Sequence, residues 1–196
     1  MRRILFMSLD AAIAALILAP IFWILHRKVF QSKGRTIRYY LFAVYLCAVF
    51  AVVGLPDILY IRYEPHFNFV PFAYMFSDFT SSFLNVILFV PMGIFLPLLW
   101  KDFRPFWKTL LFGFAASFFI ELLQIFTFRA SDINDLMTNS VGTVIGWFLS
   151  RLFLHLFPSI NPKSCRKDLY WVLGTTLAVM YFVHPFFSKL IWIPFS

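Results

Sequence analysis

The sequence predicts an all-α fold: a polytopic transmembrane helix bundle of about six spans, with one aromatic segment that is interfacial or re-entrant. Of the 196 residues, 61% are hydrophobic and only 13% are charged, whereas soluble globular domains carry about 25% charged residues. Several apolar runs approach or exceed the roughly 20 residues that a helix needs to cross the hydrocarbon core of a bilayer. We therefore expect residues 1–196 to form a single membrane domain.

The formal net charge of +8 fits the same class of protein. The basic residues lie in short loops between the apolar runs, where they orient a protein in a membrane. Nucleic acid is therefore not an expected partner. Cys47 lies in an apolar run and Cys165 in a basic loop, without the spacing of a metal site, so we expect both to be free thiols.

Residues 1–60 are expected to hold two N-terminal spans, at 4–25 and 39–59. Asp10 interrupts the first apolar run, which argues against a cleaved signal peptide. It is either a member of a polar site or a residue close to the water interface.

An aromatic segment follows, at residues 60–83, and Pro65 and Pro71 interrupt it. The segment is too broken for a spanning helix and too apolar for a free loop, so we expect it in the membrane interface. It is either an aromatic anchor or a lid over a polar site.

Four further spans are expected, the last of them as a C-terminal span within residues 165–196; their ranges are 83–100, 107–128, 133–156 and 169–187. The fourth and fifth spans each carry small and polar residues at helical spacing. On the fourth these are Gly113, Ser117, Glu121 and Gln124, and on the fifth Asp135, Asn139, Gly142 and Gly146. Because small residues let helices approach closely in lipid, we expect these two faces to meet.

The loops after the first, third and fifth spans contain most of the Lys and Arg residues. Positively charged loops stay on the cytoplasmic side. This rule places both termini, the aromatic segment and the turn at 129–135 outside the cytoplasm.

The outward end of the bundle gathers polar residues inside or beside apolar runs, where ionisable groups are costly and mark functional sites by default. The candidate ligand-binding residues are Asn85, Glu121, Gln124, Arg129, Asp132, Asp135 and Asn139.

Each candidate also has a structural interpretation. Asp132 is a good N-cap for the fifth helix, with Asp135 in its first turn, while Asn139 and Gln124 suit interhelical hydrogen bonds. Arg129 either pairs with a nearby aspartate or contacts lipid phosphate. Glu121 lies deeper, so it must be hydrated, paired with Arg129 or protonated, and it is the candidate catalytic group.

Two ligand classes suit this set of side chains. Glu121, Asp132 and Asp135 are candidate ligands of a divalent cation, which prefers oxygen ligands. The same groups suit the amines and hydroxyls of a lipid headgroup or glycan. A transporter is not expected, because the charges gather near one face and no inverted repeat is visible.

Three motifs occur in order along the chain: NVILFVPMGIFLPLL, FFIELLQIF and RASDINDLMTNSVGTVIG. Together they resemble the VanZ-like family of bacterial membrane proteins, and the resemblance covers a core at residues 66–150. The matching positions are Asn85, Phe89, Pro91, Gly93, Glu121, Gln124, Arg129, Asp132, Asp135, Asn139 and Gly142. NFVPF at 68–72 also resembles a motif that often precedes these three.

The resemblance implies a multi-pass protein of the bacterial cell membrane that confers resistance to glycopeptide and lipoglycopeptide antibiotics, teicoplanin in particular. The implied partners are membrane lipid, the lipoglycopeptide and the lipid-linked cell-wall precursor, all met at the outer leaflet. We favour a non-enzymatic role that limits access of the drug to its target. The alternative is a membrane enzyme that modifies a lipid-linked envelope substrate, with Glu121 as general base and the two aspartates holding a divalent cation.

Overall fold

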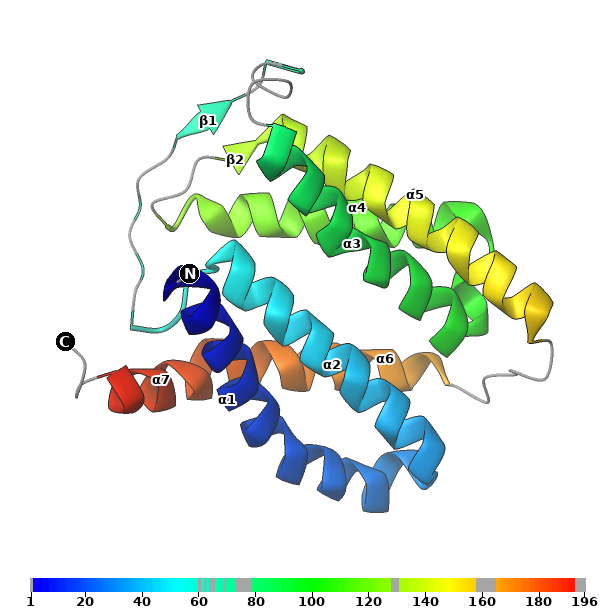
Figure 1. Cartoon of the computed structure of the whole chain (residues 1–196). Coiled ribbons are helices and arrows are strands. Elements are labelled where there is room, and N and C mark those ends of the chain that lie inside the picture. The colour runs from blue at the N-terminus through cyan, green and yellow to red at the C-terminus, as the bar shows by residue number, and fades with distance from the viewer. Residues whose placement is uncertain are drawn as a thin grey trace. The chain divides into compact units, whose positions relative to one another are not determined.

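We describe the fold from a computed structural model of the chain. The residues that it describes are 2–59, 61, 63, 66–68, 70–72, 79–127, 131–157 and 165–192. Helices dominate these residues (Figure 1), which confirms the all-α fold class. Five helical segments among them are long and apolar enough to cross a membrane: Ser8–Phe30, Lys33–Val53, Phe79–Leu99, Phe106–Gln124 and Arg166–Leu190.

The chain divides into two compact units. One contains Met1–Ile61 together with Cys165–Ser196, and the other contains Arg62–Ser164. We refer to them as the terminal unit and the central unit. The expected polar site lies wholly within the central unit.

The terminal unit begins with a helical hairpin. Helix α1, Arg2–Leu25, continues as the π-helix η1, His26–Phe30, and α2 spans Lys33–Val53. Helix α1 confirms the first expected span, at 4–25. The second expected span, at 39–59, was wrong at both ends, because α2 begins and ends earlier in the chain. Helix α2 ends because Gly54 adopts φ of 68° and donates its N–H to the Phe50 carbonyl at 2.9 Å, a left-handed helix end that glycine adopts without strain.

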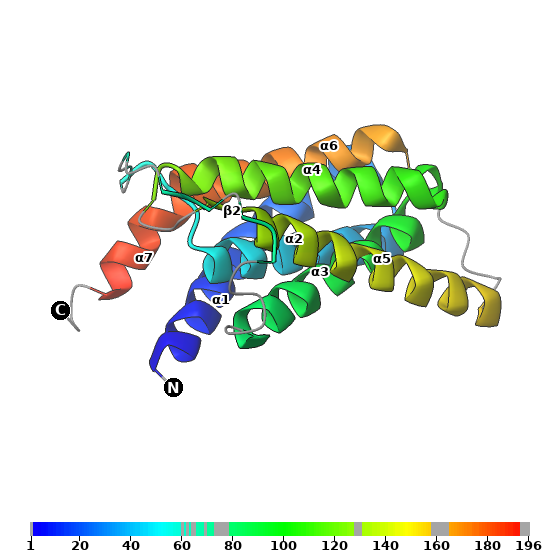
Figure 2. The same cartoon turned by 90° about the horizontal axis from the view of Figure 1, so that it is seen from above.

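The C-terminal part of the terminal unit is helical throughout residues 166–192, in three segments (Figure 2). They are α6, Arg166–Ala178; the π-helix η3, Val179–Val183; and α7, His184–Trp192. Pro185 has no N–H to donate to the Tyr181 carbonyl one turn earlier. The Ile58 N–H donates to that carbonyl instead, at 3.3 Å, so the helix continues past the proline.

Asp10 joins the first and last helices of the terminal unit. Its Oδ1 accepts a hydrogen bond from Ser188 Oγ at 2.9 Å, and its carbonyl lies 3.2 Å from His184 Nε2. Asp10 is therefore part of the α1–α7 packing.

The described residues of the central unit form three long helices and two very short strands. Their bounds are β1 Phe67–Asn68, α3 Phe79–Leu99, the 3-10 helix η2 Lys101–Phe103, α4 Phe106–Gln124, β2 Ser131–Asp132 and α5 Ile133–Leu156. Helix α5 has the expected bounds, whereas α3 begins earlier than expected. Helix α4 ends earlier, because turn bonds replace helical bonds at Phe126 and Thr127. Helix α5, with 24 residues, is also long enough to span a bilayer. It is not one of the five segments named above because its polar residues make it less apolar than they are.

Small residues on α5 pack against α3. A methyl group added at Gly146 would overlap the Val90 carbonyl oxygen and lie 2.8 Å from the Gly93 Cα atom. A methyl group added at Gly142 would likewise overlap the Val86 carbonyl oxygen. The expectation that Gly142 and Gly146 face the fourth span was therefore wrong, because a stripe of small residues does not specify which neighbour it admits.

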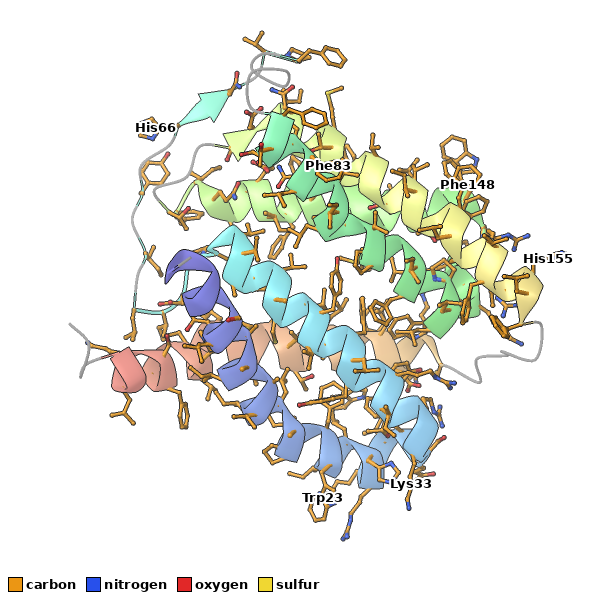
Figure 3. The ribbon with its side chains drawn as sticks, in the orientation of Figure 1. Trp23, Lys33, His66, Phe83, Phe148 and His155 are labelled. Carbon is orange, nitrogen blue, oxygen red and sulfur yellow. The ribbon has the colours of Figure 1, made fainter. Side chains whose placement is uncertain are left out.

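The described part of the aromatic segment includes β1, the turn at 70–72 and the first turns of α3, where Phe83 projects (Figure 3). Residues 60, 62, 64, 65, 69 and 73–78 lie outside the described residues. The position of this segment relative to a membrane stays a prediction.

Candidate functional site

The N-terminus of α5 is the point at which the polar residues of the central unit meet. Asp132 is its N-cap, and its side chain accepts a hydrogen bond from the Asn134 N–H at 2.8 Å. Asp135 lies in the first helical turn, where a negative charge complements the helix dipole. The sequence-based interpretation of Asp132 as a cap is confirmed.

Glu121, near the end of α4, holds the segment that leads into α5. Its Oε2 atom accepts a hydrogen bond from the Asp132 N–H at 2.8 Å, and its carbonyl accepts one from Ser131 Oγ at 2.6 Å. The residue is only 8% exposed. A buried carboxylate therefore links the end of α4 to the start of α5.

The described part of the aromatic segment contacts this same point. Strand β1 runs parallel to β2 with Asn68 opposite Asp132, and Asn68 Nδ2 donates to Asp132 Oδ2 at 3.0 Å. Asn134 holds the adjacent turn, because its Oδ1 accepts from the Phe72 N–H at 2.7 Å and its Nδ2 donates to the Val70 carbonyl at 3.3 Å. Residues of the NFVPF motif are thus bonded to the start of α5.

Helix α3 reaches the same place through Asn85, whose Nδ2 donates to Asp135 Oδ1 at 2.7 Å. We call the set Asn68, Asn85, Glu121, Asp132, Asn134 and Asp135 the carboxylate-amide cluster. It joins β1, α3, α4 and α5 at one end of the central unit. His66 lies beside β1 near this end, whereas His155 lies at the far end of α5 (Figure 3).

Two more candidates lie between α4 and α5. Asn139 is 5% exposed and donates from Nδ2 to Ser117 Oγ at 2.9 Å, which confirms the expected interhelical hydrogen bond for this residue. Gln124 is 3% exposed and lies on the same face of α4 as Ser117 and Glu121.

The structure thus brings Asn85, Glu121, Asp132 and Asp135 together at the start of α5, through the hydrogen bonds Asn85–Asp135 and Glu121–Asp132. Asn139 lies further along α5, and Gln124 ends α4. Arg129 lies outside the described residues. Sequence reasoning missed Asn134. Its position two residues after the N-cap of α5 was the available signal, because asparagine there can bond a neighbouring loop.

The cation site expected at Glu121, Asp132 and Asp135 is not assembled in the described part of the chain. No group of three or more His, Cys, Asp or Glu side chains in that part is placed to hold a metal ion. Asp132 and Asp135 accept hydrogen bonds from asparagine amides, and Glu121 accepts one from a backbone N–H. These bonds direct the carboxylates towards three different partners.

Comparison with known proteins assigns the chain to a family. The family described as VanZ/LLP1 matches residues 39–154, a range that contains the whole carboxylate-amide cluster. The chain belongs to the VanZ/LLP1 family. Among VanZ relatives, "Protein VanZ" of Enterococcus faecium is 31% identical over 121 residues, which is 60% of this chain and 70% of that protein. No solved structure matches the chain significantly.

In this VanZ-family protein, Asp132→Ala is expected to lower the free energy of unfolding by about 1–2 kcal/mol, because α5 loses its N-cap. Asp132→Asn keeps an oxygen at the capping position, but its NH2 group cannot accept the hydrogen bond from Asn68 Nδ2, so it is expected to cost about 1 kcal/mol less than Asp132→Ala, which loses both. Thermal unfolding of both variants in detergent measures the difference. Equal destabilisation by the two variants would show that the charge of Asp132 or its bond to Asn68, rather than its cap, stabilises this end of the helix.

Proposed function

We propose that this VanZ-family protein lowers the susceptibility of a bacterial cell to glycopeptide antibiotics of the teicoplanin type. In this proposal the carboxylate-amide cluster faces the outer leaflet and binds the drug or a lipid headgroup, which limits access of the drug to its target. The observation that carries the proposal is the convergence of the family's polar motif positions on one cluster.

The charge distribution within the central unit supports the outward orientation. The described Lys and Arg residues of this unit lie at the end away from the cluster, in or next to η2, at the start of α4 and in the last turns of α5; they are Lys101, Arg104, Lys108 and Arg151. Helix α4 separates the two ends by about 28 Å at 1.5 Å per residue. By the positive-inside rule, the basic end is cytoplasmic and the acidic end extracytoplasmic.

Binding has more support than catalysis. The alternative enzyme needs Asp132 and Asp135 to hold a divalent cation near Glu121, but their described hydrogen bonds point them to separate amide partners. The same bonds pre-organise a negatively charged surface at low conformational cost, which favours recognition of a ligand.

The test compares antibiotic susceptibility of cells that express wild type, Glu121→Gln or Asp135→Asn at matched membrane levels. Both variants keep an oxygen that accepts the described hydrogen bond, from the Asp132 N–H or from Asn85 Nδ2, while the second carboxylate oxygen becomes an NH2 group and the charge is removed. We expect wild type to raise the inhibitory concentration of teicoplanin. Each variant is expected to lose most of that protection, because a charged hydrogen bond contributes about tenfold or more in affinity.

Asp102→Asn is the matched control, because Asp102 is an exposed carboxylate in η2, at the other end of the unit. It is expected to protect as well as wild type. If all the variants protect equally, the cluster is structural and the binding role is wrong. If wild type itself gives no protection, the resistance role does not extend to this chain.

A further inference from the structure

Among the described side chains of the carboxylate-amide cluster, acceptor oxygens outnumber donor nitrogens. The side-chain nitrogens of Asn68, Asn85 and Asn134 already donate to a carboxylate of the cluster. Asn139 donates to Ser117. A ligand therefore meets three carboxylates and amide groups whose nitrogens already have acceptors, which favours a ligand that donates.

Two buried oxygens next to the cluster have no hydrogen-bond partner at all among the described residues. They are Gln124 Oε1 and Asn139 Oδ1, and both residues are more than nine-tenths buried. A buried acceptor without a donor is costly, and native proteins seldom keep one unless water, an ion or a ligand satisfies it. These two oxygens mark a place where a donor is missing.

Both oxygens belong to the seam between α4 and α5. Asn139 is bonded across this seam to Ser117, and Glu121 follows Ser117 by one helical turn on the buried face of α4. Gln124 follows Glu121 on that same face. Along the seam, Glu121 thus lies about one helical turn from each of the two residues with a spare oxygen: Gln124 on α4, and Asn139 on α5 at the level of Ser117.

We propose that this seam binds a protonated primary amine. An alkylammonium group has three N–H donors and a positive charge, so it can donate to one of the spare side-chain oxygens and to the carboxylate at once. A quaternary ammonium has the charge but no N–H, and an anionic group meets like charge. The inference rests on the proposed function, since it names the chemical class of ligand that the same site takes.

The amine can reach the seam from two sources: a phospholipid headgroup in the leaflet, or a soluble amine such as an amino sugar. Two probe pairs separate them. Phosphatidylethanolamine and phosphatidylcholine with the same acyl chains differ only in N-methylation, and glucosamine and N-acetylglucosamine differ only in whether the amine is free.

The experiment measures binding of each probe to the full chain in phosphatidylcholine nanodiscs, by the shift in thermal unfolding and by native mass spectrometry. We expect the free-amine member of at least one pair to bind about tenfold more tightly than its blocked partner, the scale of one charged hydrogen bond. If phosphatidylethanolamine binds more tightly than phosphatidylcholine, the ligand is a lipid headgroup. If glucosamine binds more tightly than N-acetylglucosamine, the ligand is a soluble amine. If neither pair shows a preference, water fills the seam and the proposal is wrong.

Gln124→Met provides the second arm, because methionine has nearly the shape of glutamine without the unpartnered oxygen. Without amine probes the variant is expected to unfold at a higher temperature than wild type, since it removes a buried unsatisfied acceptor. It is also expected to lose most of the amine preference, whereas Asp102→Asn keeps it. A Gln124→Met variant that retains the full preference overturns the proposal.

These outcomes are independent of the susceptibility test. Amine preference without protection in cells would leave the ligand class standing and remove the resistance role. Protection that depends on Glu121, without a preference for free amines in nanodiscs, would leave the resistance role standing and remove the amine as the ligand class.

Discussion

Gly146→Ala is expected to disrupt the packing of α5 on α3 and to lower the free energy of unfolding of the central unit by about 3 kcal/mol or more. The added methyl group would overlap the Val90 carbonyl oxygen and approach the Gly93 Cα atom to 2.8 Å. Both obstacles are backbone atoms of α3, so no side chain can rotate away to make room. Overpacking of this kind costs about 1–3 kcal/mol even where side chains yield, and here two helices must separate.

The matched control is Gly174→Ala. Gly174 lies inside α6, and an added Cβ would meet no atom within 4 Å. Alanine is the better helix former, so this variant is expected to be about 0.5–1 kcal/mol more stable than wild type.

Thermal unfolding of purified protein and the yield of monodisperse protein from membranes measure both substitutions. The expected result is that Gly146→Ala lowers the unfolding temperature and Gly174→Ala raises it. A Gly146→Ala variant as stable as wild type would mean that α3 and α5 do not approach as closely as the structure has them.

Local chemistry explains which parts of the fold the sequence could predict. The start of α5 follows from Asp132, whose capping role needs only its neighbours in the chain. The bounds of α2 do not follow from hydropathy, because the helix begins in the polar stretch at Lys33 and ends in an apolar run at Gly54. Hydropathy indicates which residues can lie in the hydrocarbon core of a membrane, whereas backbone conformation determines where a helix ends.

The candidate site shows the same limit. Motif spacing identified Asn85 and Asp135, but their hydrogen bond joins residues that are distant in the chain. The contact of Asn68 with Asp132 depends on a strand pair too short to leave a sequence pattern. Likewise, the unpartnered oxygen of Gln124 is a property of packing, since the sequence shows an amide and not whether a donor faces it.

Asp168→Ala is expected to have the largest effect in the terminal unit, a loss of about 3 kcal/mol in the free energy of unfolding. Asp168 Oδ2 accepts hydrogen bonds from Tyr39 Oη at 2.9 Å and from the Cys165 N–H at 3.3 Å. It also pairs with Arg35 Nη1 at 3.3 Å, where the aspartate side chain is 6% exposed and the arginine side chain 24%. Without the aspartate, Arg35 keeps the Phe30 carbonyl as an acceptor but loses its counter-charge, and the buried Tyr39 hydroxyl loses its acceptor. Breaking a fully buried pair costs about 3–5 kcal/mol, and the partial exposure of Arg35 puts the expected loss at the lower end.

The double variant Arg35→Met with Asp168→Leu separates two contributions to stability: the cost of leaving one charge unpaired, and the net stabilisation that the ion pair provides. Apolar residues of similar volume often replace a buried ion pair at no cost, so the double variant is expected to recover much of the stability that Asp168→Ala loses. Asp102→Ala, which removes an exposed carboxylate, is expected to stay within about 0.5 kcal/mol of wild type. If the double variant is as unstable as Asp168→Ala, the bonds to Tyr39 and Cys165, rather than the ion pair, fix the start of α6 against α2.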